Sequence, residues 1–210
     1  VRPAFVLAII SQESAIGRNV GQCYVTDAKT GSGKYSNGNL VSRIMHPTRD
    51  LPVFLDIINK SGRTMAKTPV SCWINDCVAQ SKGVLYHSKA YVSSTGAITC
   101  AKSGYVPYGF GGAMGPAQFI PSTWKLYQDK VKAQTNKSYA DPWNLKDAFT
   151  AAGIYLKDLG AGTQAGEYKA ASRYYGGSSS YASSVSTRAW CINEYMNKGS
   201  MSDYCQGLIF

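Results

Sequence analysis

Apolar positions at the start of the chain repeat with the spacing of an α-helix. A helix over residues 4–15 would place one stripe of side chains on a shared face. That stripe consists of Val6, Ile9, Ile10 and Glu13. Pro3 suits the first turn of this helix, and Gly17 follows its end. Glu13 therefore ends an apolar stripe, which is an unusual position for a carboxylate.

The pattern changes over residues 23–105, which are rich in Gly, Ser and Thr and contain short β-branched runs. Turn signals occur at residues 31–33 and 37–38. A short helix is predicted over Leu51–Lys60, and residues 84–94 predict one or two short strands. The apolar face of that helix would consist of Val53, Phe54, Ile57 and Ile58. We interpret the block as a cysteine-containing insertion or lobe within a single domain of residues 1–210.

Residues 106–199 return to helical periodicity. Helices are predicted over residues 123–134, 144–159, 168–175 and 181–199. Ser122 is predicted to cap the first helix, and Asn144 with Asp147 resembles a capping box for the second. Glycines mark the ends of the last three helices, at Gly160, at Gly176 with Gly177, and at Gly199. The apolar stripe of the last helix would consist of Tyr181, Val185, Ala189, Ile192 and Met196.

Composition narrows the class of protein. Hydrophobic residues make up 44% and charged residues 16% of the chain, which excludes a disordered polar chain. The formal net charge of +10 favours an anionic partner, and nucleic acid, an acidic membrane surface and bacterial cell wall all qualify. The basic residues are scattered, so the charge also fits solubility alone.

The sequence contains no apolar stretch long enough to span a bilayer. The apolar run at residues 4–10 lacks the basic flank and cleavage site of a signal peptide. Because the first residue is Val1 rather than Met, we expect the chain to be processed or excised from a longer protein.

Six cysteines in a chain of this composition favour disulfides and an oxidising compartment. Zinc is the alternative, but the chain has no C-x-x-C pair, and its two histidines are not at ligand spacing. We therefore predict no metal site. Cys191 and Cys205 are close in sequence and flank a predicted helix end, so we predict a bond between them.

Three segments contain residues that could carry chemistry, and Glu13 is the first. A carboxyl among apolar side chains loses hydration, which raises its pKa and lets it act as a general acid toward a glycosidic oxygen. The alternative is a helix-end glutamate that faces solvent or bonds with the hydroxyl of Ser11 or Ser14.

The second segment, residues 109–124, reads GFGGAMGPAQFIPSTW. Its small residues allow backbone to approach a ligand closely, and Gln118 offers both a donor and an acceptor to sugar hydroxyls or amides. The alternative is a tight packing loop. A Gly-rich phosphate cradle is a further alternative for this segment, but it has neither P-loop spacing nor G-x-G-x-x-G after a strand. Residues 31–34 (GSGK) are followed by Tyr35 rather than Ser or Thr, so they are not a P-loop.

The third segment, residues 170–177, reads AASRYYGG. Two adjacent tyrosines before paired glycines could place one phenol in a cleft, and ordinary helix-end packing is the alternative. Tyr105, Tyr108 and Phe110 are further candidates for stacking against sugars.

Together these segments resemble, in the same order, the lytic transglycosylase and goose-type lysozyme superfamily. The family has Glu-Ser at the end of a buried helix, found here in SQESAIGRNVG (residues 11–21). Its Gly-Ala-x-Gly-x-x-Gln-x-x-Pro-x-Thr-Trp stretch matches residues 112–124, and its Ala-x-x-Tyr-x-x-Gly helix resembles residues 171–177. Residues 141–157 look like the helix between those two motifs. The resemblance implies a mainly α, lysozyme-like α+β fold with a Gly/Ser/Thr-rich insertion containing short strands.

The resemblance also implies roles for single residues. Glu13 would be the catalytic acid and then the base, with Ser14 orienting it. The substrate-binding residues would be Ser14, Met114, Gln118, Phe119, Tyr174 and Tyr175, to which Tyr108 is added as a stacking residue. Tyr175 stands where many members have Asn, and residues 23–105 have no counterpart.

The implied reaction is cleavage of the bond between N-acetylmuramic acid and N-acetylglucosamine in peptidoglycan, with a 1,6-anhydro-muramyl product and no cofactor. A lysozyme-type hydrolase is the near alternative, which would use water and a second carboxylate. Asp27 is the first candidate for that carboxylate and Asp50 the second. A non-catalytic cell-wall-binding module is another. A nucleic-acid partner is not expected, because no basic helix or aromatic platform with interleaved Lys and Arg is present. We expect an extracytoplasmic monomer.

Overall fold

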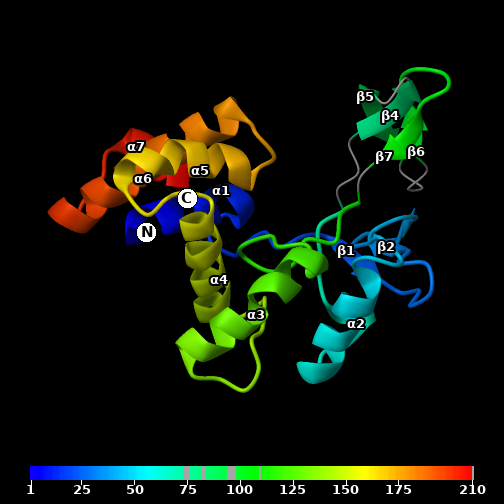
Figure 1. Ribbon diagram of the computed structural model, residues 1–210, viewed down its shortest axis with the longest axis horizontal. Coiled ribbons are helices and arrows are strands. Elements are labelled where there is room, and N and C mark those ends of the chain that lie inside the picture. Colours follow the sequence, from blue (N-terminus) through cyan, green and yellow to red (C-terminus); the bar gives the residue numbers. More distant parts are fainter. Residues whose placement is uncertain (73–75, 82–83, 94–97, 109, 210) are drawn as a thin grey trace. The chain divides into compact units, whose positions relative to one another are not determined.

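The computed structural model describes residues 1–72, 76–81, 84–93, 98–108 and 110–209 (Figure 1). It is mainly helical with two small antiparallel sheets, as the predicted α+β class requires. The chain forms two compact units. The first contains residues 1–19, 115–119 and 123–210, and the second contains residues 20–114 and 120–122.

The first unit is built around helix α1 (Pro3–Ser14), which packs against α6 (Ser179–Lys198) and α4 (Leu145–Asp158). Helix α5 (Glu167–Tyr174) and helix α7 (Asp203–Ile209) also pack against α6 (Figure 1). A short 3₁₀ turn, η2 (Gln164–Gly166), leads into α5, and α3 (Pro121–Thr135) precedes α4. The core includes the fully buried Phe5, Ala8, Ile9, Leu156 and Val185.

Local sequence explains most of these helix ends. Pro3 stands in the first turn of α1, and Ala15 ends the helix in the left-handed conformation at φ 48°. The side chain of Asn144 accepts from the N–H of Asp147, so the predicted cap of α4 is confirmed. Gly199 ends α6 at φ 73°, also as predicted.

Two predictions about these helices are wrong. Ser122 does not cap α3, because the helix already begins at Pro121. The backbone N–H of Ser122 is bonded instead by the carboxylate of Asp50 at 3.1 Å. Met196 does not continue the buried stripe of α6, since its side chain is 55% exposed.

The second unit contains a three-stranded antiparallel sheet in the order β1 (Cys23–Val25), β2 (Gly33–Tyr35), β3 (Leu40–Val41). Helix α2 occupies Leu51–Lys60, as predicted, and η1 (Met65–Lys67) follows it. Residues Leu51, Phe54, Ile57 and Ile58 of α2 are buried, whereas Val53 is only partly so.

The second sheet of this unit has the order β6 (Ile98–Cys100), β5 (Val84–Val92), β4 (Asp76–Ser81), β7 (Val106–Tyr108), and its neighbours are all antiparallel. The strand predicted within residues 84–94 is therefore confirmed as β5, although residue 94 lies outside the described residues. Sequence alone did not identify β4.

All six cysteines form disulfides, which join Cys23 to Cys72, Cys77 to Cys100, and Cys191 to Cys205. The predicted Cys191–Cys205 bond is confirmed. It fastens the short helix α7 to α6.

Candidate active site

Glu13 lies in the last turn of α1, and its neighbours on the helix face the core. Ile9 and Ile10 are fully buried, and Val6 is partly buried beside them. Loss of hydration raises the pKa of the Glu13 carboxyl to about 7, in the direction that the sequence predicted. A carboxyl with this pKa can hold a proton near neutral pH and also release it.

The bonding partner of Glu13 is Tyr181, at the start of α6. Its phenolic O–H donates to Oε1 of Glu13 at 2.5 Å. Neither serine proposed as an alternative partner takes that place, because the Ser11 hydroxyl accepts from Arg188 and the Ser14 hydroxyl bonds backbone. Helical spacing assigned Tyr181 only to the apolar stripe of its helix. The signal for a polar role was its hydroxyl, because a buried tyrosine usually finds a hydrogen-bond partner.

Ser14 connects the end of α1 to the Gly-rich segment that contains Pro116. Ser14 is 2% exposed, and its hydroxyl donates to the carbonyl of Pro116 at 2.7 Å and accepts from the N–H of Gly17 at 2.9 Å. Ser14 thus fixes the backbone around Glu13. Its proposed role in orienting the Glu13 carboxyl stays a prediction.

A cavity of about 420 Å³ opens beside Glu13 in the first unit. This volume lies in the range of small-molecule binding sites. The described residues that line it are Gln12, Glu13, Tyr175, Ser178, Ser180, Tyr181 and Ser184. Glu13 is the one carboxylate among these seven side chains, and the others offer hydroxyl, phenol and amide groups.

Tyr175 and Tyr181 form an aromatic wall of this cavity. Their rings are stacked with centroids 4.7 Å apart and planes at 5°. Tyr175 is 51% exposed, whereas Tyr181 is 7% exposed. Tyr181 thus lies behind Tyr175, and the ring of Tyr175 is accessible. The structure places Tyr175 with Glu13 at one cavity, and its part in substrate binding stays a prediction.

The segment around Gln118 is held by its own hydrogen bonds. Gly115 and Gln118 both adopt positive φ, at 62° and 52°, and Nε2 of Gln118 donates to the carbonyl of Gly115 at 2.8 Å. The phenol of Tyr174 donates to the carbonyl of Ala117 at 2.7 Å. Burial and the nearby charge of Glu13 raise the pKa of Tyr174, so this phenol stays protonated. The segment is therefore fixed on the side of α5.

Phe119 is 4% exposed and lies within a group of aromatic side chains. Its ring centroid is within about 6 Å of those of Trp124, Tyr127, Tyr155 and Tyr174. This packing anchors Phe119, and with it the backbone next to Gln118, in the first unit. Met114 is fully buried and belongs to the second unit, where it bridges to Val70.

The three aromatic residues considered for sugar stacking belong to the second unit, and their stacking role stays a prediction. Phe110 packs edge-on against His46 at 4.7 Å and beneath the guanidinium of Arg43 at 4.5 Å. Tyr105 lies under the Nζ of Lys102 at 5.6 Å. Tyr108 ends strand β7, but its side chain, like the whole of Gly109, lies outside what the structure describes.

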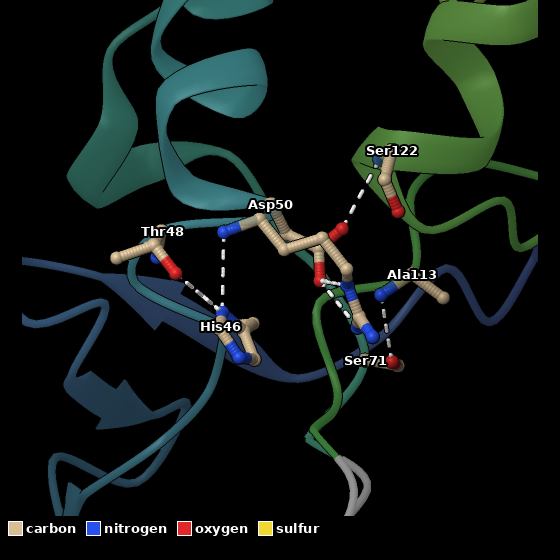
Figure 2. A network of polar contacts seen from close by, with 7 residues as sticks. His46, Thr48, Asp50, Ser71, Ala113 and Ser122 are labelled. Carbon is tan, nitrogen blue, oxygen red and sulfur yellow. Dashed lines mark hydrogen bonds and ion pairs between the residues drawn. The ribbon is translucent and has the colours of Figure 1, made fainter.

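The two aspartates considered as a second catalytic carboxylate both support local structure. Asp27 accepts from the hydroxyl and N–H of Thr30 and from the N–H of Lys29, and these bonds lower its pKa. Asp50 is fully buried and binds Arg49 at 2.6 Å through Oδ2 and Ser122 through Oδ1. Figure 2 shows the contacts of Asp50, together with the bond from the N–H of Ala113 to the hydroxyl of Ser71.

Among the described residues, no group of three or more His, Cys, Asp or Glu side chains could hold a metal ion. No helix in the described ranges is long and apolar enough to cross a membrane.

Comparison with known proteins gives a likeness of fold. No family model matches the chain, and no curated protein matches its sequence. Two solved structures of Escherichia coli lytic transglycosylase Slt35 are similar to it, one in complex with bulgecin A and one in complex with calcium. Their TM-scores are 0.58 and 0.57 at 16% identity, and each match covers 94% of this chain and 68% of the other. The chain therefore has the fold of a lytic transglycosylase.

Proposed function

We propose that this protein is a peptidoglycan lytic transglycosylase with Glu13 as its catalytic acid and base. It would cleave the β-1,4 bond between N-acetylmuramic acid and N-acetylglucosamine and form a 1,6-anhydro-muramyl product. The observation that carries the proposal is a desolvated carboxyl with a pKa of about 7 at the wall of a polar cavity, in a chain with this fold.

The first step needs a protonated carboxyl. Burial keeps a large fraction of Glu13 protonated near neutral pH, so it can donate to the bridging oxygen as the glycosidic bond breaks. Oε1 already accepts from Tyr181, and no described residue bonds Oε2. Oε2 is thus the oxygen that would carry the transferred proton.

The second step needs a carboxylate. The sugar's own 2-acetamido group would stabilise the cationic centre, so no second protein carboxylate is required. Glu13, now anionic and stabilised by the Tyr181 O–H, would take the proton of the muramyl C6 hydroxyl. That oxygen then bonds C1 and closes the 1,6-anhydro ring, without water.

The hydrolase alternative receives less support. Asp27 and Asp50 both use their carboxylates in local hydrogen bonds, and neither lines the cavity that contains Glu13. The proposal also includes the wider predictions: a single catalytic domain in which the second unit serves as a lobe, a monomer, and an extracytoplasmic location. Three disulfides support that location.

The test is digestion of purified peptidoglycan by the wild-type protein and by Glu13→Gln, with mass spectrometry of the released muropeptides. Products one water lighter than lysozyme products, absent with Glu13→Gln, are expected. Hydrated reducing ends would reject the transglycosylase in favour of a hydrolase. Sedimentation with the wall but no release by either protein would leave a binding module.

A further inference from the structure

The side chain of Gln12, next to the proposed catalytic residue, is held in one orientation. Its Oε1 accepts from Nε of Arg188 at 2.8 Å and from the hydroxyl of Ser184 at 2.7 Å. A guanidinium can only donate, so the atom that faces Arg188 must be the amide oxygen. The NH₂ group is then the part of this amide that remains for an occupant of the cavity.

Arg188 is itself fixed at several points. Besides Gln12, its guanidinium donates to the hydroxyl of Ser11 at 3.0 Å and to the carbonyl of Leu208. Leu208 belongs to α7, which the Cys191–Cys205 disulfide fastens to α6. Contacts to α1 and α7 thus fix the guanidinium of Arg188, which lies on α6, and this guanidinium fixes the amide of Gln12.

The NH₂ of Gln12 has no partner of its own among the described residues. Gln12 lines the same cavity as Glu13. It contributes an amide to this cavity, whereas Tyr175 and Tyr181 contribute stacked aromatic rings. A fixed amide donor beside an accessible aromatic face suits a sugar ring that carries a strong neutral acceptor. The carbonyl oxygen of an acetamido group is such an acceptor.

We propose that Gln12 is a specificity-determining residue whose NH₂ donates to the acetamido carbonyl of an N-acetylhexosamine stacked on Tyr175. The proposal rests on the proposed function for its substrate class. Arg188 and Ser184 act as positioning residues, because they fix which end of the amide faces the cavity.

Gln12→Glu is the sharpest test. Glutamate keeps the length of the side chain and the oxygen that binds Arg188, and it replaces the NH₂ donor with an acceptor. Binding is measured by calorimetry in the Glu13→Gln protein, so that no turnover interferes. The probes are the β-1,4-linked tetramer of N-acetylglucosamine and cellotetraose, which has hydroxyls in place of the acetamido groups.

Glu13→Gln is expected to prefer the N-acetylated tetramer. Adding Gln12→Glu should raise its Kd for that tetramer by roughly five- to tenfold, as loss of one hydrogen bond implies, and leave the Kd for cellotetraose within about twofold. Gln164→Glu, which adds the same charge at an exposed position outside the cavity, should change neither. If Gln12→Glu does not fold, as judged by thermal melting, Gln12→Met removes the donor without adding charge.

Three results would overturn the proposal: an unchanged preference in the Gln12 variants, an equal rise in both Kd values, or no binding of either tetramer. The two proposals can fail separately. Selective binding that is lost in Gln12→Glu, with no digestion of peptidoglycan by the wild-type protein, rejects the enzyme and keeps the sugar site. Digestion with unaltered selectivity rejects the role of Gln12 alone.

Discussion

The phenolic O–H of Tyr181 donates to Oε1 of Glu13 at 2.5 Å and joins the start of α6 to the end of α1. Burial of Glu13 raises its pKa, and this bond lowers it. The pKa of Tyr181 is itself raised well above its ordinary value, mainly by burial, so the phenol remains the donor. The balance of the two effects leaves Glu13 able to exchange a proton near neutral pH.

Tyr181→Phe removes the bond and keeps the ring. We expect the pKa of Glu13 to rise above its present value of about 7. Because a hydrogen bond to a charged group contributes about 1.5–3 kcal/mol, the rise should be about one to two pH units. NMR titration of the glutamate side-chain carboxyl carbons measures it directly. Tyr168→Phe is the control, since the Tyr168 hydroxyl bonds Ser179 at the surface, and an unmoved Glu13 titration in Tyr181→Phe would contradict the assignment.

Glu13 should also make stability depend on pH. Its folded-state pKa is raised from 4.5 to about 7, so its contribution to stability is fully present below pH 4.5 and is lost as the pH rises through 7. Glu13→Gln does not titrate. Relative to wild type, this variant should gain about 2–3 kcal/mol in free energy of unfolding between pH 4 and pH 8.5. Urea denaturation at the two pH values tests this, and a pH-independent difference would show that Glu13 is not desolvated.

Ser14→Ala should destabilise the first unit. The change leaves the buried carbonyl of Pro116 and the N–H of Gly17 without their hydroxyl partner. We expect a loss of about 1–3 kcal/mol in the free energy of unfolding, measured by urea denaturation. Ser186→Ala is the matched control, because the Ser186 hydroxyl only repeats a bond to the carbonyl of Ala182 within its own helix. Equal losses in both variants would mean that Ser14 has no anchoring role.

Gly115→Ala should be more damaging still. Gly115 has φ +62°, and an added Cβ would lie 1.9 Å from the carbonyl oxygen of Pro142. The strain and the clash should lower the free energy of unfolding by more than about 3 kcal/mol. Gly162→Ala, where a Cβ meets nothing within 4 Å, should be neutral or stabilising by up to about 1 kcal/mol. Thermal melting of the pair gives the comparison, and a well-folded Gly115→Ala protein would contradict this packing.

Sequence predicted the elements whose limits are set locally. Helix α2 begins after Asp50 and has the predicted bounds because its apolar spacing is complete within ten residues. The end of α6 follows from Gly199, and the cap of α4 from Asn144. The burial that raises the pKa of Glu13 followed from its place on the apolar stripe of α1.

The features that sequence did not predict depend on distant partners. The N–H of Ser122 is bonded by Asp50, 72 positions away, so no local pattern could reveal it. Tyr181 is 168 positions from Glu13, and helical spacing does not say whether its phenol bonds a carboxylate or packs in the core. Met196 lies in the last turn of α6 with 55% of its surface exposed, and helical spacing alone does not say where along α6 the packing of other helices ends. Helix α7 is too short, at seven residues, for periodicity to identify it.

The three disulfides pair the cysteines in the order in which they occur along the chain: first with second, third with fourth, fifth with sixth. In a chain that emerges from a translocation channel N-terminus first, each cysteine therefore meets its partner before the next pair appears. Oxidation can keep pace with emergence, and every correct bond joins the two thiols that became available most recently. This pairing order reduces the number of mismatched partners that each thiol can meet during emergence.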